Sequence, residues 1–184
     1  KNAFSSTREV MLAEVGGVFE LNVTRVGSLV LKVYDSSGSY SLLKESLEGN
    51  PINDKSWHYI AVALEHRVLK EDNIATVKVY VDGKEIASQV VFLNSLKANP
   101  TVLSVGSNFA GMVDEVSFWN KFFSSSHSTI GGTYEWSFDG RKPLTGREEG
   151  LLLYYRFNDV RGTSDVAISD STGKSELTAH HITF

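Results

Sequence analysis

The sequence predicts an all-β fold in which two antiparallel sheets pack face to face as a β-sandwich. Two observations lead to this prediction. Short segments of alternating apolar and polar residues follow one another along the chain, and Gly, Asn, Asp and Ser separate them. Helical periodicity is scarce, while apolar residues make up 41% of the 184 residues, which suits a globular core.

The N-terminal part of the chain predicts a meander. Residues 17–24, 28–35 and 40–44 alternate as half-buried strands do, and Ser36-Ser37-Gly38 has the composition of a turn. The pattern before residue 17 is weak. We therefore expect the first strand of the sandwich to come from the C-terminal segment or from sequence outside this chain.

The next predicted strand covers residues 57–65. It is apolar at both sets of alternating positions, which is typical of a central strand covered on both faces. Trp57, at its start, is expected in the core or packed behind it. The polar segment 66–73 that follows is predicted to be a loop.

Residues 75–82 show the clearest alternation in the chain, with Lys78 and Tyr80 expected on the outer face. Asp82-Gly83 then favours a two-residue hairpin turn, because both residues tolerate positive φ angles. Residues 84–92 are expected to return as the partner strand. The inward positions are Val77, Val79 and Val81.

The C-terminal half predicts more strands and little helix. Thr145-Gly146-Arg147-Glu148 has the spacing of a capping box, and we expect one or two helical turns there or at 124–130. The predicted strands are residues 102–106, 112–119, 150–157 and 177–184.

One carboxylate in these strands falls on an unexpected face. Side chains alternate across a strand, so Asp114 shares a face with Met112, Val116 and Phe118. This face is the more apolar one, and Asp114 is therefore predicted to point inward. A buried carboxylate must be hydrogen-bonded, paired with a cation or bound to a metal.

Charge and composition exclude several classes of function. The net charge is −4 and the basic residues form no stripe, which disfavours nucleic acid and an electrostatic membrane anchor as partners. No apolar run approaches the ~20 residues of a membrane span. Cysteine is absent, so no disulfide framework indicates the compartment.

Four segments together resemble laminin G-like (LamG-like) modules of the concanavalin A-like lectin/glucanase superfamily. The segment from Trp57 to Val62 resembles a family strand, and the segment from Val77 to Ala87 resembles the family hairpin. The sequence from Gly111 to Val116 and the later aromatic strand with its Asp170-Ser171-Thr172-Gly173 turn complete the set. The resemblance implies a concanavalin A-like jelly roll with one concave and one convex sheet.

The resemblance covers roughly residues 20–175. It departs from the family at residues 124–130, where the expected short helix lacks its carboxylates, in the insertion 131–142, which has no counterpart that we can match, and in the weak N-terminal portion. We predict one jelly-roll domain over residues 1–184, excised from a larger protein. The resemblance favours an extracellular or cell-surface location and leaves an intracellular one open.

Catalysis is not expected. Glucanases of this superfold need two carboxylates that flank one glycosidic bond, whereas Asp114 and Glu115 are adjacent and face opposite sides of the predicted strand. Glu148-Glu149 lies in a turn, and five scattered His residues give no zinc spacing.

Calcium is a possible cofactor, because related modules bind it at a loop edge. Asp114, Asp159 and Asp170 fall at matching family positions and could supply part of the oxygen set that Ca²⁺ needs. Alternatively, Asp159 and Asp170 bond their own backbone in turns, and Asp114 accepts backbone N–H bonds.

Glycan binding would use exposed aromatic side chains with polar groups beside them. Tyr134, Trp136 and Phe138 alternate in the unmatched insertion, with Arg141 nearby. The alternative is an extra strand or flap whose aromatic residues close over the sandwich. Asn22-Val23-Thr24 is a glycosylation acceptor in a secreted protein.

The sequence therefore predicts a non-catalytic recognition or adhesion module that binds a glycan or a protein partner on the concave sheet or at the loop rim. The alternative is a purely structural module that packs against other domains of its parent protein.

Overall fold

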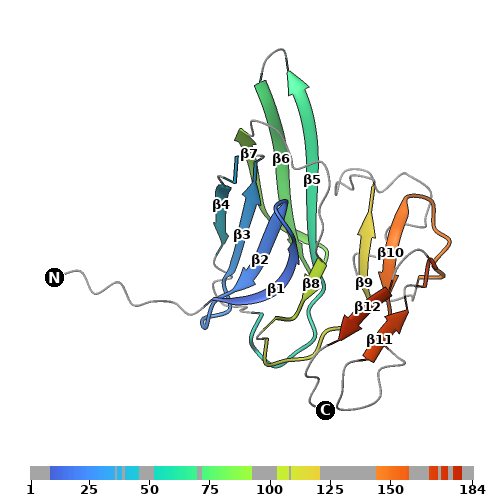
Figure 1. The fold of residues 1–184 in the computed structure, drawn as a ribbon. Helices are drawn as coiled ribbons and strands as arrows, with labels where there is room; N and C mark the ends of the chain where they lie inside the picture. The colour runs from blue at the N-terminus through green and yellow to red at the C-terminus, as the bar shows by residue number, and fades with distance from the viewer. Residues whose placement is uncertain are drawn as a thin grey trace. The chain divides into compact units, whose positions relative to one another are not determined.

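The computed structural model describes residues 9–35, 37–38, 40–45, 52–69, 72–92, 103–107, 109–120, 144–157, 166–169, 171–173 and 176–179. The chain divides into two compact units, Lys1–Gly111 and Met112–Phe184. Within the described residues every regular element is a strand, and all strand pairs are antiparallel (Figure 1). This confirms the predicted fold class, whereas the single domain over 1–184 stays a prediction.

The first unit contains a five-stranded sheet with the strand order β4-β3-β2-β1-β8. Its meander confirms the three strands predicted from the N-terminal alternation. The strands are β1 (Val10–Val15), β2 (Phe19–Val23), β3 (Leu29–Tyr34), β4 (Tyr40–Glu45) and β8 (Leu103–Val105).

Strand β1 corrects the expectation that the first strand would come from elsewhere. It lies between β2 and β8, and Ala13 is the register partner of both Leu21 and Val105. The register with β2 shifts between Met11 and Ala13, which marks a β-bulge or a similar irregularity. A shift of this kind interrupts the period-two pattern that sequence reasoning relies on, so the strand is hard to recognise.

The second sheet of this unit has three strands, β5 (Ile60–Leu69), β6 (Asp72–Val81) and β7 (Lys84–Phe92). The middle strand is β6, so the prediction of a central strand at 57–65 was wrong. The predicted loop at 66–73 was also wrong, because β5 and β6 pair as far as Leu69 and Asp72. The two strands are paired by hydrogen bonds between backbone groups, and polar residues do not prevent such pairing.

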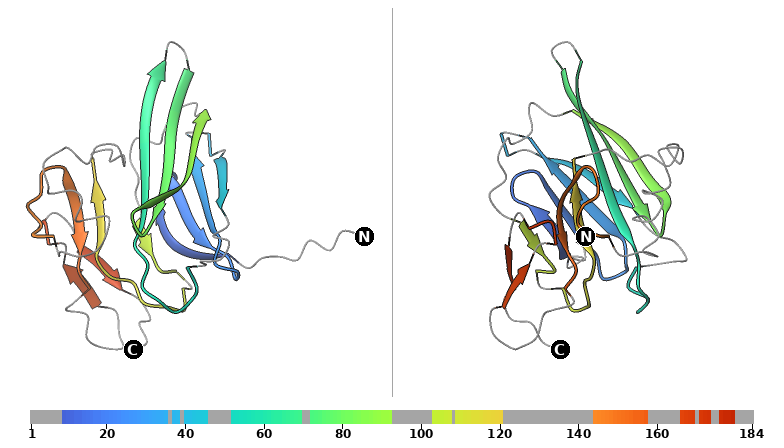
Figure 2. Two further views of the ribbon diagram at one scale, coloured as in Figure 1. Left: turned by 180° about the vertical axis from the view of Figure 1, so that it is seen from behind. Right: turned by 90° about the vertical axis from the view of Figure 1, so that its right-hand side faces the viewer.

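The two sheets of the first unit pack as two layers (Figure 2). The predicted inward valines of β6 are confirmed as buried, with Val77 and Val79 at most 2% exposed. Leu31 and Val33 of β3 belong to the same core cluster. Each fully buried side chain of this kind contributes roughly 1.5–3 kcal/mol, so this interface is the main source of stability in the unit.

The end of β6 follows the sequence prediction closely. Asp82 and Gly83 have φ angles of 52° and 80°, as a tight hairpin turn requires. Tyr80 lies on the outer face as predicted, yet it is only 1% exposed. Its hydroxyl donates a hydrogen bond to Oε2 of Glu85 over 3.3 Å.

The second unit holds two strand pairs. Strands β9 (Val116–Trp119) and β10 (Leu151–Tyr155) form one pair, and β11 (Val166–Ser169) and β12 (Glu176–Ala179) form the other. Strand β11 was not predicted. The Ser171 N–H donates to the carbonyl of buried Tyr154 over 2.7 Å, which ties the turn after β11 to β10.

Asp114 does not point inward, so that prediction was wrong. The strand begins only at Val116, because Glu115 has a left-handed φ of 55° that breaks the alternation. Asp114 is exposed, and its Oδ1 accepts the Glu115 N–H over 2.9 Å. Glu115 instead accepts the hydrogen bond of the buried Tyr154 hydroxyl.

The predicted capping box is present without a helix. Glu148 Oε1 accepts hydrogen bonds from the Thr145 N–H at 2.7 Å and from its hydroxyl at 2.8 Å. The Arg147 N–H donates to Thr145 Oγ1 at 3.3 Å. These bonds fix a compact turn immediately before β10.

Candidate ligand-binding rim

Three connections meet at one end of the first unit, and together we call them the rim. They are the turn 24–28 between β2 and β3, the loop 52–59 before β5 (the Trp57 loop) and the Asp82-Gly83 turn between β6 and β7. Asn53 Nδ2 donates to the carbonyl of Arg25 over 2.6 Å, which joins the first two connections. A hydrogen-bond cluster described below joins the second and third.

The backbone of the Trp57 loop is fixed at its first half. Ile52 packs against the core cluster, and Asp54 Oδ1 accepts the Ser56 N–H over 2.7 Å. Lys55, between Asp54 and Ser56, has a φ of 72°, a left-handed conformation that is unfavourable for a residue with a side chain. The Asp54 turn stabilises this conformation, since an Asp side chain that bonds the backbone two residues on favours a tight turn.

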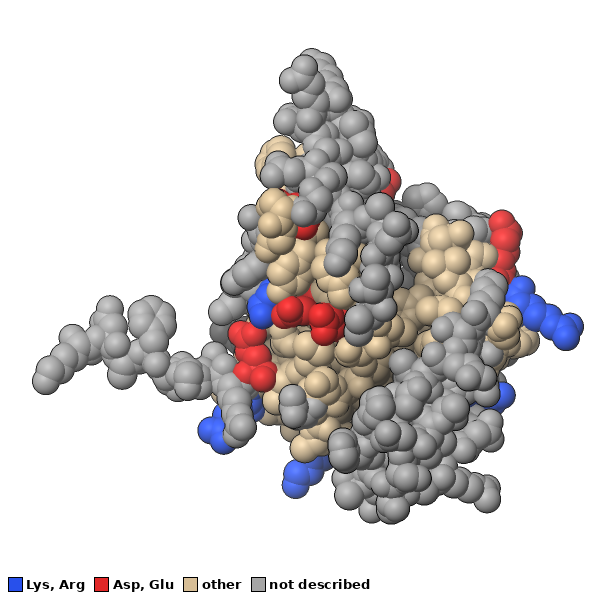
Figure 3. Space-filling model, viewed as in Figure 1, with Lys and Arg blue, Asp and Glu red and all other residues tan. Residues whose placement is uncertain are grey.

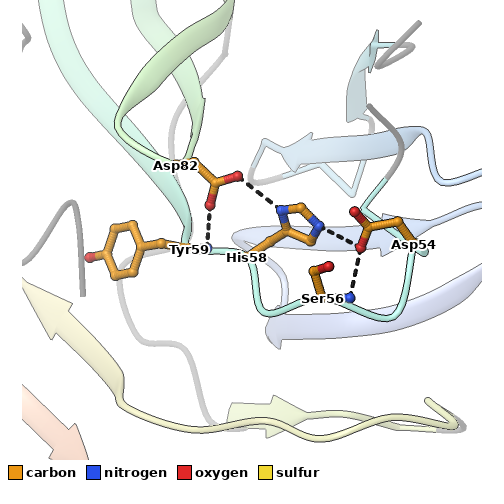
Figure 4. Close-up of polar contacts among 5 residues, drawn as sticks. All are labelled: Asp54, Ser56, His58, Tyr59 and Asp82. Carbon is orange, nitrogen blue, oxygen red and sulfur yellow. Dashed lines mark hydrogen bonds and ion pairs between the residues drawn. The ribbon is translucent and has the colours of Figure 1, made fainter. Parts of the chain in front are cut away.

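A histidine flanked by two carboxylates fixes the second half of the loop. His58 Nδ1 lies 2.9 Å from Asp82 Oδ2, and Nε2 lies 3.0 Å from Asp54 Oδ1. Figure 4 shows the imidazole ring between the two carboxylates, with the ring of Tyr59 turned away from it. We call these three residues the His58 clip.

The clip also holds the first backbone groups of the β5–β6 ladder. Asp82 Oδ1 accepts the Tyr59 N–H over 2.9 Å, and the Asp82 N–H donates to the Tyr59 carbonyl over 2.8 Å. The loop and the hairpin turn are thus joined by side-chain and backbone bonds at the same point.

The electrostatics of the clip favour its charged form. Hydrogen bonding to Asp82 raises the pKa of His58 above its ordinary value, and Asp54 adds to this while partial burial opposes it. The Ser56 N–H and then His58 lower the pKa of Asp54. Burial raises the pKa of Tyr59 to about 12, so its hydroxyl is neutral at ordinary pH.

The clip has the groups of a catalytic dyad but not the geometry. A general base needs a ring nitrogen within hydrogen-bond reach of the proton that it abstracts. Both nitrogens of His58 face carboxylate oxygens. The cluster is therefore suited to holding the loop in place, and not to activating a nucleophile.

Trp57 lies between the fixed residues and points outward. It is 63% exposed, so the prediction that it packs in the core was wrong. Strand β5 begins only at Ile60, and Trp57 therefore belongs to the loop and not to the strand. In the turn 24–28, Val26 is also exposed, at 67%.

Basic side chains lie in or next to the connections of the rim. Arg25 in the turn 24–28 and Lys55 in the Trp57 loop are exposed, and so is Lys84, the first residue of β7 after the Asp82-Gly83 turn. Figure 3 shows basic side chains at the lower edge of the first unit and acidic ones over its visible face. The acidic side chains of β1 and β2 include Glu14 and Glu20, which are cross-strand partners. The rim and its border therefore carry basic side chains beside the exposed carboxylates of Asp54 and Asp82.

The site residues predicted from sequence mostly lie outside the described residues. This holds for the proposed glycan platform and for two of the three proposed calcium ligands: Tyr134, Trp136, Phe138, Arg141, Asp159 and Asp170. Asp114 is described and exposed. Among the described residues no group of three or more His, Cys, Asp or Glu residues could hold a metal ion. The calcium site stays a prediction.

Asn22 is the one predicted glycosylation site. It lies in β2 between β1 and β3 and is only 4% exposed. A side chain this buried has no room for a glycan, so the structure argues against glycosylation at this position.

A family model of the laminin G type, described as the concanavalin A-like lectin/glucanases superfamily, matches residues 2–127. The chain belongs to this superfamily. The match spans β1 to β9 and so includes the whole rim. Comparisons with curated proteins and with solved structures found no match.

Membership in this superfamily gives the function in general terms. Laminin G-like modules bind carbohydrate or protein, are usually non-catalytic and are commonly extracellular, although the superfamily includes glycosidases. In the described part of the chain no helix has the length and apolar character needed to cross a membrane.

Sequence reasoning missed the His58 clip, although a signal was present. In an antiparallel pair the start of one strand lies beside the end of the other. Ile60 pairs with Val81, so His58 and Asp82 are brought close as soon as the two strands are paired. The prediction treated the two segments only as separate motifs.

Proposed function

We propose that this laminin G-like module is a non-catalytic recognition module, and that it binds a glycan at the rim. The observation that supports this proposal is Trp57, an exposed aromatic ring on a loop whose backbone is held at Asp54, Ser56, His58 and Tyr59. Ordering a mobile loop costs free energy on binding. A loop that is already fixed avoids most of that cost.

The chemistry around Trp57 suits a sugar. The flat apolar face of an indole matches the C–H face of a sugar ring, and polar groups beside it can bond the hydroxyls. Lys55 lies two residues from Trp57, and Lys84 lies two residues from Asp82 in the neighbouring turn. The residues proposed from sequence in the insertion, Tyr134, Trp136, Phe138 and Arg141, are a second candidate platform.

The test is a glycan array probed with the wild-type domain and with Trp57→Ala, with and without calcium. Phe92→Ala is the matched control, because Phe92 is also an exposed aromatic residue of the first unit, at 73%, and lies at the far end of β7. We expect Trp57→Ala to reduce binding at least about 30-fold, as for a hot-spot aromatic residue, and Phe92→Ala to leave it unchanged.

Other results would contradict the proposal in different ways. Binding that survives Trp57→Ala but is lost in Trp136→Ala moves the site to the insertion. No binding by a folded domain excludes a glycan under these conditions and leaves a protein partner. Loss of binding on chelation would support a calcium site that includes Asp114, Asp159 or Asp170.

A specific observation favours the structural alternative. Val90 and Phe92 are neighbours on one face of β7 and are 52% and 73% exposed. A module that only packs against other domains of its parent protein would bury such residues. In that case Phe92→Ala would weaken attachment to the neighbouring domain, and Trp57→Ala would have no effect on it.

A further inference from the structure

The geometry of the His58 clip fixes the protonation state of the ring. Both ring nitrogens lie within 3.0 Å of carboxylate oxygens. An ionised carboxylate only accepts hydrogen bonds, and a neutral imidazole has one N–H. Both bonds therefore form only when His58 is an imidazolium with two N–H groups.

The two carboxylates belong to different parts of the rim. Asp54 is in the Trp57 loop, and Asp82 is in the turn that ends β6. Loss of one ring proton must break or weaken one of the two links. Trp57 directly precedes His58, and its other neighbour, Ser56, is held by Asp54. Any change in the clip is therefore transmitted to the backbone on both sides of the indole.

In the described part of the chain, the charged groups that face the imidazole ring are the two aspartates of the clip. Asp54 comes from the ring's own loop and Asp82 from the hairpin turn, whereas the neutral Tyr59 of the β5 entry has its ring turned away (Figure 4). Lys55 directly follows Asp54, Lys84 lies two residues after Asp82, and both lysines are exposed. The His58 side chain is only 9% exposed, whereas Asp54 and Asp82 are 33% and 46% exposed, so a carboxylate that loses its N–H partner turns to solvent and the link to the ring is lost.

We propose that the imidazolium of His58 is the positioning group of the Trp57 platform, and that ligand binding at the rim weakens when this group loses its proton. The second clause of this inference depends on the proposed function. The first clause concerns the free protein and can be tested without a ligand. His58 is a positioning residue, since it acts through the loop that carries Trp57.

The test follows two NMR signals of the full chain as a function of pH. One is the imidazole of His58, assigned with His58→Gln. The other is the indole N–H of Trp57, assigned with Trp57→Phe. We expect both signals to titrate with the same midpoint, above the ordinary histidine value of 6.5. Asp54→Asn should lower both midpoints together, because it removes one of the two negative charges.

The matched control is Asp35→Asn. Asp35 Oδ1 accepts the Ser37 N–H over 2.9 Å, the same hydrogen bond that joins Asp54 to Ser56, but it lies at the opposite end of β3 from the rim. This substitution should leave both midpoints unchanged. An indole signal that does not titrate, or whose midpoint differs from that of His58, overturns the inference.

Binding of the array-selected glycan is then measured below and above the His58 midpoint. We expect a roughly tenfold weaker affinity above it, equivalent to about one charge-assisted hydrogen bond, and no pH step in His58→Gln. A binding curve without this step overturns the second clause. If no glycan binds while the two signals titrate together, the proposed function fails and the positioning role of His58 is retained.

Discussion

Two turns of the first unit use the same local device and differ in what it is connected to. Asp35 and Asp54 each accept a backbone N–H from the serine two residues on, over 2.9 Å and 2.7 Å. Asp54 also faces His58, and through it the hairpin turn that contains Asp82. An Asp turn on the surface is a local feature of the chain. It becomes the base of a candidate site when a largely buried side chain links it to a turn that is distant in sequence.

Removal of the linking side chain should have the largest effect. His58→Ala removes both links between the loop and the hairpin turn, and we expect it to reduce the free energy of unfolding by about 1–2 kcal/mol, because the two carboxylates are partly exposed to solvent. Asp35→Ala removes a local turn bond and should cost less than about 1 kcal/mol. Urea unfolding at pH 6 measures both. Equal losses would show that the link adds nothing to the turn.

The two carboxylates of the clip should not be equivalent. Asp82 contacts His58 and accepts the Tyr59 N–H, and its own backbone has a positive φ. We expect Asp82→Asn to leave the turn in place and to reduce the free energy of unfolding by about 1 kcal/mol. Asp54→Asn should shift the urea midpoint by a smaller amount. The reverse order would mean that the loop, and not the hairpin turn, carries the stabilisation.

The contribution of the clip should depend on pH in a defined direction. The pKa of His58 is raised in the folded state, so its contribution is complete below pH 6.5 and is lost as the pH rises through the folded value. The pKa of Asp54 is lowered, so its contribution is present above pH 3.8 and is lost as the pH falls through the folded value. The difference in stability between wild type and His58→Ala should therefore be largest in mild acid. Urea midpoints from pH 4 to 9 test this, and a difference that grows above pH 8 would contradict it.

The smallest effect is expected at Asp114. The residue is exposed and bonds only its neighbour's N–H among the contacts described, so Asp114→Ala should change stability by less than about 0.5 kcal/mol. Glu115→Ala should cost more, because Glu115 accepts the hydroxyl of buried Tyr154. Thermal unfolding of the two variants distinguishes these adjacent carboxylates. A large loss for Asp114→Ala would restore the sequence-based view of this residue.

The comparison also explains which parts of the fold the sequence reveals. The inward valines of β6 and the Asp82-Gly83 turn were correctly predicted, because alternation and turn chemistry are local properties of the chain. Strand β1 was missed, because its register shift disturbs the alternation. The segment 66–73 was predicted as a loop because its residues are mostly polar, whereas the strand pairing there is made by backbone groups.

The site was harder to predict than the fold, for a related reason. Trp57 and Asp114 were placed by extending a strand pattern beyond the point where the strand ends. At Asp114 a single left-handed residue, Glu115, changes the face that the next side chains occupy. Strand ends depend on such local conformations and on partners distant in sequence, and one sequence alone shows neither directly.

The two-residue turn after β6 has a consequence for the order in which the unit folds. A hairpin with a short turn closes within microseconds, long before strands distant in sequence must meet. Asp82 can therefore adopt its position as β6 and β7 pair, while His58 reaches it only when the entry to β5 docks. We expect the clip to form after the rate-limiting barrier, so that His58→Ala mainly accelerates unfolding and leaves the refolding rate nearly unchanged. The two arms of a chevron plot would show this, and the rim would then be the part of the sandwich that closes last and opens first.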